Sequence, residues 1–154
     1  MKKLLGLRPL WAFGIFVLLD IICIGMGMGV PIFCILFGFL VGWFVVKYIT
    51  ATITPVSQVF RRVLLYATLT ASVTLLGMVV IWGPTISFLL DPTRDLANTG
   101  VPMILYEPVA SFIGWLVLMI VISPFLQLLT TLFGAYLTLL GWLNGGGKAS
   151  MKTT

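Results

Sequence analysis

Four long runs of apolar residues alternate with short polar segments along the chain. The runs cover residues 10–26, 30–49, 63–82 and 109–143. A transmembrane helix needs about 20 predominantly apolar residues, and each run is near or above that length. The pattern therefore predicts an all-α integral membrane protein in which a bundle of four helices crosses the bilayer.

The segments between the runs predict the connections. "GMGMG" at residues 25–29 indicates a tight hairpin turn between the first two helices, because glycine permits positive φ. Residues 83–108 predict one longer loop between the third and fourth helices, although the third run could continue past Pro84 to Leu90. Residues 1–9 predict a short N-terminal segment, and residues 144–154 predict a flexible tail. We expect residues 10–143 to form one membrane domain.

The fourth run is longer than one perpendicular span. A helix over residues 109–143 would measure about 52 Å, whereas the hydrocarbon core of a bilayer is about 30 Å thick. Pro124 lies within the run, and no charged or glycine-rich turn divides it. Because proline interrupts the helical hydrogen bonds, we predict one tilted helix with a kink at Pro124.

The composition agrees with a membrane protein. Hydrophobic residues make up 60% of the chain and charged residues only 8%, whereas about a quarter of the residues of a soluble domain are charged. A net charge of +5 would suggest nucleic-acid binding in a soluble protein. In a membrane protein it first indicates orientation. We therefore expect the lipid bilayer, and no nucleic acid, as a partner.

Most basic residues fall in segments that share one side of the predicted bundle. They occupy the N-terminus, the second connection and the C-terminus: Lys2, Lys3, Arg8, Lys47, Arg61, Arg62, Lys148 and Lys152. Arg94 lies in the opposite loop with Asp91, Asp95 and Glu107. The positive-inside rule then predicts that both termini are cytoplasmic. We expect a multi-pass protein of the cytoplasmic membrane of a prokaryote.

Asp20 is a carboxylate inside a predicted span. A charged group at this depth is costly, and it usually faces the interior of a bundle or a water-filled cavity. Arg94 is the basic residue expected on the same, outer side. Asp20 and Arg94 are therefore the candidate polar residues. Two roles remain open for Asp20: a hydrogen-bonded structural group that joins helices, or a site for an ion, a proton or a substrate.

Cys23 and Cys34 flank the predicted hairpin turn. They could face each other and form a disulfide, and with Met26 and Met28 they could bind a soft metal such as Cu(I). Cysteine is also an ordinary buried apolar residue. We expect thiols that are reduced or only optionally linked, no firm metal site and no cofactor.

Small residues at helical spacing predict close contacts between helices. They form three groups: Gly38 and Gly42 in the second run; Ala67, Ala71 and Thr74 in the third; Gly134 and Gly141 in the fourth. We expect the first of these groups to bring the first and second helices together. The groups could pack within one chain or could face a partner or a second copy.

Missing residue types exclude several functions. The chain has no histidine, which excludes histidine acid–base catalysis and most zinc sites. We expect a protein that is not an enzyme, and most simply an accessory subunit or assembly factor of a larger membrane complex, with a protein partner in the membrane or as a homo-oligomer. Two alternatives remain: a small oligomeric transporter or channel that uses Asp20, and a thiol-redox or copper-binding protein that uses Cys23 and Cys34.

Overall fold

The computed structural model describes residues 9–26, 31–51 and 55–150. The helices are, in chain order, α2 (Pro9–Met26), α3 (Ile32–Thr50), α4 (Val56–Trp82), the 3-10 helices η1 (Gly83–Leu90) and η2 (Leu96–Asn98), α5 (Pro108–Val117), the π-helical turn η3 (Leu118–Ile122) and α6 (Ser123–Ser150). These described ranges contain helices and no β-strand, so the predicted all-α class is confirmed for them.

Three helical stretches are long and apolar enough to cross a membrane. They are Ile32–Thr50, Val56–Leu90 and Pro108–Asn144. The first predicted span is also helical, but its apolar stretch, Trp11–Gly25, is shorter. The centre of the predicted hairpin turn, residues 27–30, lies outside the described residues. The structure is compatible with an integral membrane protein.

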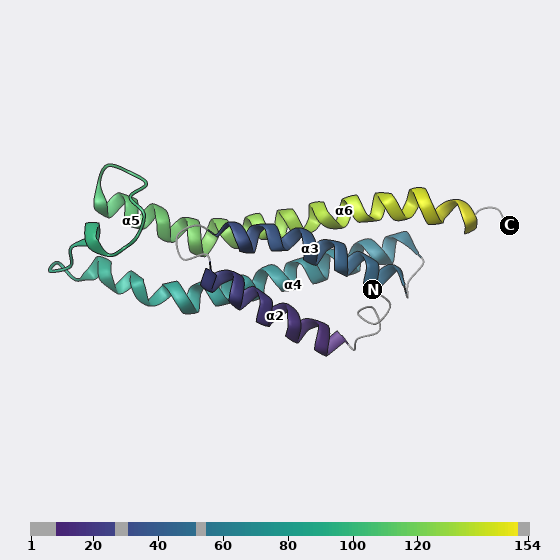
Figure 1. Cartoon of the computed structure of the whole chain (residues 1–154), viewed down its shortest axis with the longest axis horizontal. Helices are drawn as coiled ribbons and strands as arrows, with labels where there is room; N and C mark the ends of the chain where they lie inside the picture. Colours follow the sequence, from purple (N-terminus) through teal and green to yellow (C-terminus); the bar gives the residue numbers. More distant parts are fainter. Residues whose placement is uncertain (1–8, 27–30, 52–54, 151–154) are drawn as a thin grey trace.

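The helices follow one long axis and alternate in direction (Figure 1). α2 runs toward the end of the molecule that carries the connection between η1 and α5, α3 runs back, α4 returns, and α5 and α6 run back again. The start of α2 and the end of α6 therefore lie toward the same end. α2 is inclined to the other helices, so its first turns stand away from them.

α3 and α6 run in the same direction and form the most extensive contact between helices. A Cβ atom added to Gly42 would lie 2.7 Å from the backbone nitrogen of Ala135, and one added to Gly134 would lie 2.7 Å from the carbonyl oxygen of Phe39. Gly38 meets the backbone of α6 in the same way. These glycines let two backbones touch. Their partner is α6, however, and the expectation that the α3 pair faces the first helix was wrong.

Gly141 takes no part in this contact. It is exposed, and no atom lies within 4 Å of a Cβ added to it. The buried residues of α6 follow an i, i+4 row through Gln127, Thr131, Ala135 and Leu139. Each step along such a row turns by about 40° around the helix axis. The face that contacts α3 has therefore rotated away from position 141.

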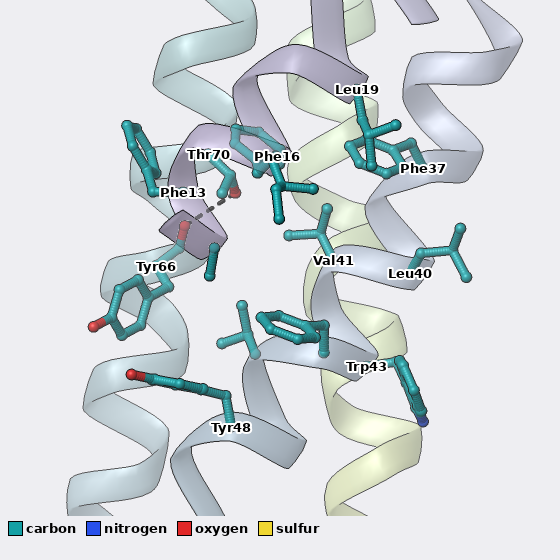
Figure 2. A pocket seen from close by; sticks show the side chains of 14 residues that line it. Phe13, Phe16, Leu19, Phe37, Leu40, Val41, Trp43, Tyr48, Tyr66 and Thr70 are labelled. Carbon is teal, nitrogen blue, oxygen red and sulfur yellow. Dashed lines mark hydrogen bonds between the residues drawn. The ribbon is translucent and has the colours of Figure 1, made fainter. Parts of the chain in front are cut away.

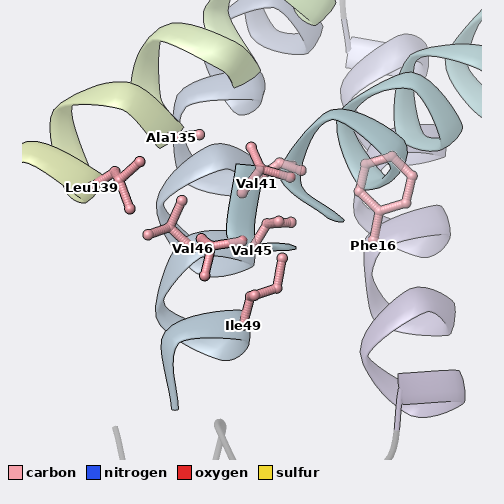
Figure 3. Packing of buried hydrophobic residues seen from close by; sticks show 9 residues of the cluster. Phe16, Val41, Val45, Val46, Ile49, Ala135 and Leu139 are labelled. Atoms are coloured by element: carbon pink, nitrogen blue, oxygen red, sulfur yellow. The ribbon is translucent and has the colours of Figure 1, made fainter. Parts of the chain in front are cut away.

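Two apolar clusters fill the interior at different heights. The first cluster joins α2, α3, α4 and α6 (Figure 3) and consists of Phe16, Val41, Val45, Val46, Ile49, Val59, Val63, Ala135 and Leu139. The second cluster lies nearer the long connection and consists of Ile24, Cys34, Met78, Phe112, Trp115, Leu116 and Met119. The two clusters are about two turns apart along α2, from Phe16 to Ile24, and about four turns apart along α4, from Val63 to Met78. A separate layer therefore lies between them.

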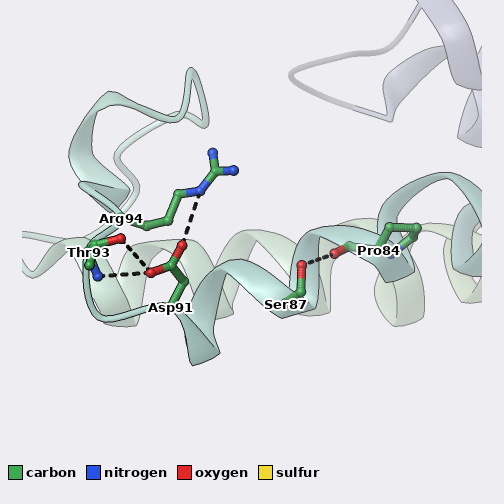
Figure 4. Close-up of polar contacts among 5 residues, drawn as sticks. All are labelled: Pro84, Ser87, Asp91, Thr93 and Arg94. Atoms are coloured by element: carbon green, nitrogen blue, oxygen red, sulfur yellow. Dashed lines mark hydrogen bonds and ion pairs between the residues drawn. The ribbon is translucent and has the colours of Figure 1, made fainter.

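The helical stretch made of α4 and η1, Val56–Leu90, extends beyond the predicted span at both ends. It begins at Val56, where the carbonyl oxygen of Pro55 accepts hydrogen bonds from the N–H groups of Gln58 and Val59. Residues 83–90 form η1, although the sequence predicted a loop from residue 83. Pro84 has no N–H group for a regular α-helix. The chain instead tightens into a 3-10 helix, in which the Ser87 hydroxyl donates to the Pro84 carbonyl oxygen at 2.7 Å (Figure 4).

The last helical run is irregular at Pro124 and longer than predicted. The turn before Pro124 is π-helical, and the N–H group of Ser123 donates to the carbonyl oxygen of Leu118. A regular helix would press the proline ring against the carbonyl group of Ile120, and the wider turn accommodates it. α6 then continues to Ser150, past the start of the predicted flexible tail. Extending an existing helix needs no new nucleus, so the glycines after residue 144 do not end it at once.

Candidate functional site

Asp20, Thr74 and Gln127 form a buried polar layer between the two apolar clusters. Asp20 lies on α2 one turn from Phe16 and one turn from Ile24, which belong to the first and second clusters. Thr74 lies one turn before the buried Met78 on α4, and Gln127 lies one turn after the buried Ser123 on α6. Helical spacing therefore places each polar side chain on the inward face of its own helix.

The Asp20 carboxyl group joins three helices through hydrogen bonds. The hydroxyl of Thr74 donates to Asp20 Oδ2 at 2.7 Å, and the Nε2 group of Gln127 donates to Asp20 Oδ1 at 3.1 Å. All three side chains are almost completely buried, at 1%, 0% and 1% exposure. Both carboxyl oxygens thus have a donor within the chain. Buried hydrogen bonds of this kind hold helices at a fixed height relative to one another.

Further hydrogen bonds connect this layer to α3. The backbone carbonyl oxygen of Gln127 accepts from the hydroxyls of Thr130 and Thr131, at 3.0 and 2.7 Å. The hydroxyl of Thr130 also donates to the carbonyl oxygen of Ile35 on α3, at 2.6 Å. This bond lies beside Gly38, where the two backbones come closest. The hydrogen bonds of the polar layer therefore involve all four long helices, α2, α3, α4 and α6.

Some buried polar atoms near this layer have no hydrogen-bond partner among the described residues. They are Oε1 of Gln127, Oγ of Ser123, and the Nε1 atoms of Trp82 and Trp115. Ser123 and Gln127 are one turn apart on α6, and the two tryptophan rings meet edge to face at 4.7 Å. An unpaired buried polar atom costs about 1–3 kcal/mol. These atoms therefore mark places in the interior where further hydrogen bonds could form.

The chemistry available to the polar layer is limited. The Thr74 hydroxyl and the Asp20 carboxyl lie at a distance suited to a nucleophile and its base. Thr74 has no exposed surface, however, so a substrate cannot reach its oxygen. Within the described ranges, no group of three histidine, cysteine or acidic residues could hold a metal ion. The arrangement is suited to joining helices.

Arg94 lies on the surface and has its own partners. Its Nε atom is 3.7 Å from Asp91 Oδ2, and its guanidinium group lies 4.2 Å above the ring of Phe88. Asp91 Oδ1 accepts hydrogen bonds from the hydroxyl and N–H group of Thr93, at 2.6 and 3.0 Å (Figure 4). These bonds hold the pKa of the Asp91 carboxyl below its usual range. The structure therefore pairs Arg94 with Asp91 and does not bring it together with Asp20.

Both cysteines are free thiols. Cys34 is completely buried in the second cluster, and Cys23 packs against that cluster with part of its surface exposed. Met28 and the side chain of Met26 lie outside what the structure describes. The optional disulfide remains a prediction. The soft-metal site also remains a prediction, and it depends partly on those two methionines.

Gln127 is the member of the site that the sequence patterns did not single out. It is a lone amide within the apolar stretch "SPFLQLLTT" of residues 123–131. That isolation is a usable signal, because an amide in hydrocarbon needs a partner. Thr74 entered the sequence analysis only as a small residue, and its hydroxyl proves to be the closer partner of Asp20.

No family model, curated protein or solved structure matches this chain.

Proposed function

We propose that this chain is a multi-pass membrane protein with four crossings and cytoplasmic termini, and that it serves as a non-catalytic accessory subunit or assembly factor of a larger membrane complex. The 18 residues of α2 span about 27 Å, close to the thickness of the hydrocarbon core. The direction of the helices supports the orientation, because the end of α3 and the start of α4, with their basic residues, lie opposite the acidic connection of residues 91–107.

The closed polar layer supports a non-catalytic role. Each oxygen of Asp20 already accepts one hydrogen bond, from Thr74 or from Gln127, and the residue is almost completely buried, so the carboxyl group presents almost no surface to a passing solute. A transported ion would first have to break hydrogen bonds between three helices. The layer instead supplies what a small bundle needs in lipid, where helices are held by packing and hydrogen bonds.

The observation that carries the proposed role is an unpaired polar strip on the outside of α4. Thr68 and Ser72 are one turn apart and exposed, and their hydroxyls bond to no residue in the described part of the chain. By contrast, the hydroxyl of Thr70 on the inner face donates to the carbonyl oxygen of Tyr66, and that of Thr74 donates to Asp20. Small and hydroxyl-bearing residues are enriched where membrane helices meet. The strip therefore supports a protein partner at α4.

A photo-crosslinking residue in place of Ser72 tests this role in cells that express the protein at its native level. We expect one crosslinked product with a larger membrane protein, and a matched replacement of Phe133, exposed on α6, should give little or none. Co-purification should then recover the same protein in a fixed ratio. Crosslinking only to lipid, or equally from both positions, would refute the proposal.

A second function, a small oligomeric transporter or channel built around Asp20, has one observation in its favour. Gln127 Oε1 and Ser123 Oγ are buried, one turn apart and without a hydrogen-bond partner among the described residues, and Gln127 itself bonds to Asp20. They could hydrogen-bond to a solute or water that enters the layer. Crosslinks from Ser72 to a second copy, together with an Asp20→Asn variant that folds but loses a measured flux, would favour this function over the first.

A further inference from the structure

An apolar groove lies where α2 diverges from α3 and α4 (Figure 2). Its volume is about 350 Å³, within the range of about 300–1,000 Å³ that is usual for ligand pockets. The lining comes from α2 between Ala12 and Leu19, from α3 between Phe37 and Tyr48, and from Tyr66 and Thr70 of α4. Almost all of these side chains are aliphatic or aromatic, so the groove suits a hydrocarbon.

The groove has two different ends. Near the polar layer, the rings of Phe16 and Phe37 stack at 5.8 Å and narrow it. Toward the end of α3, the hydroxyls of Tyr48 and Tyr66 point to the same side (Figure 2). A tyrosine at the edge of a hydrocarbon region keeps its ring in the apolar part and its hydroxyl at the headgroup level. The groove therefore opens toward a membrane surface at its tyrosine end.

Positive charge lies beside the tyrosine end. Arg62 precedes Tyr66 by one turn of α4, and Lys47 follows Phe44, a lining residue, by one turn of α3. Both basic residues are exposed. In the orientation proposed above, this end meets the cytoplasmic leaflet, where anionic lipids collect. An apolar groove that ends in two cations complements a molecule with an alkyl chain and an anionic head.

We propose that this groove binds one acyl chain of an anionic phospholipid, with the phosphate between Lys47 and Arg62 and near the hydroxyls of Tyr48 and Tyr66. The lipid would fill the space between the first turns of α2 and the rest of the bundle. This inference needs only the proposed membrane orientation and holds for either function described above.

Native mass spectrometry of the full chain in mild detergent tests the proposal. The probes are phosphatidylglycerol and phosphatidylcholine with identical acyl chains, each titrated against the protein. We expect one phosphatidylglycerol molecule to stay bound where phosphatidylcholine is lost. Each positive charge near a membrane surface raises the affinity for anionic lipid about fivefold. Arg62→Gln should weaken binding about fivefold, and Lys47→Gln with Arg62→Gln more than twentyfold.

Two matched controls locate the site. Arg61→Gln removes the same charge at the neighbouring position, which points about 140° away from Tyr66 around the helix axis, whereas Arg62 lies about 40° from it. This variant should leave binding nearly unchanged. Ala12→Phe fills the groove and should abolish retention, whereas Ala110→Phe on α5 should not. Equal retention of both lipids, equal loss in Arg61→Gln and Arg62→Gln, or a second copy bound in place of lipid would each overturn the proposal. If Ala12→Phe fails to fold, the exposed arginine pair still decides.

Discussion

The hydroxyl of Thr74 donates a hydrogen bond of 2.7 Å to Oδ2 of Asp20, and it does so across 54 positions of the chain. The bond fixes α2 against α4 at a depth where no water competes for either group. Gln127 adds a donor from α6 on the other carboxyl oxygen. The height of α2 relative to two other helices therefore depends on one side chain.

Replacing Asp20 should separate shape from hydrogen bonding. In Asp20→Asn the amide oxygen still accepts from Gln127, and the new N–H group donates to Thr74, whose hydroxyl can turn to the Thr70 carbonyl oxygen at 3.2 Å. We expect the free energy of unfolding in mild detergent to change by less than about 1 kcal/mol. Asp20→Leu leaves the Gln127 amide unpaired and should cost about 1–3 kcal/mol. A leucine variant as stable as the native chain would rule out the structural role.

Asp20 and Gln127 should be energetically coupled. Gln127→Leu alone removes a donor from Asp20 and should destabilise the chain, whereas Gln127→Leu in an Asp20→Leu background should cost much less. For contacting residues the interaction energy is about 0.5–3 kcal/mol. A double-mutant cycle measured by thermal unfolding in detergent checks this. Strictly additive effects would mean that the 3.1 Å contact contributes nothing.

Glycines of the same helices should differ in their tolerance of alanine. Gly42→Ala places a methyl group against the backbone of Thr131 and Ala135, and overpacking of this kind costs about 1–3 kcal/mol. Gly141→Ala adds a methyl group in open space on an exposed helix and should be neutral or stabilising by up to about 1 kcal/mol. Parallel unfolding curves compare the two. Equal effects would contradict the close contact of α3 with α6.

The outer connection should respond to acid through Asp91. Its carboxyl pKa is lowered by the hydrogen bonds from Thr93, so these bonds support the turn above the ordinary pKa of aspartate and are lost as the pH falls through the lowered value. NMR titration should show Asp91 titrating below its usual range. Thr93→Ala should move this pKa partly back, because the N–H bond at 3.0 Å remains. Thr99→Ala, whose hydroxyl bonds to Leu96, should not move it.

The two cysteines should differ in their accessibility. Cys34 is completely buried, whereas Cys23 has part of its surface exposed. A membrane-permeant maleimide should label Cys23 first and Cys34 only after denaturation, with or without reductant. Labelling that requires reductant at both positions would reveal a disulfide. Copper that is retained through purification and lost after Cys23→Ala with Cys34→Ala would establish the metal-binding alternative.

The helices themselves could be predicted because long apolar runs and prolines are local signals. Asp20 was also recognisable, since a carboxylate in such a run must find a partner. Its partners could not be recognised in the sequence. Thr74 and Gln127 come to lie beside Asp20 only when three helices from different parts of the chain have packed together. Arg94 was the expected companion on charge alone, but Asp91, three residues away, holds it at the surface.

The glycines show the same division between local and long-range information. A G-x-x-x-G spacing marks Gly38 and Gly42 as a contact face without identifying the helix opposite. The first helix was the expected partner because it precedes α3 directly in the chain. The observed partner is α6, where Thr131 and Ala135 lie against Gly42. Gly134 and Gly141 look equivalent in sequence, but the contact follows an i, i+4 row and leaves the second behind. Only the crossing of the two helices distinguishes them.

The pairing of α3 with α6 also sets an order on biosynthesis. The ribosome releases α3 long before it has made α6, so Gly38 and Gly42 are made before the surface that covers them. During the same interval Asp20 lacks the amide of Gln127. The packing of α3 and the hydrogen bonds of Asp20 can therefore be completed only after the last helix has been translated.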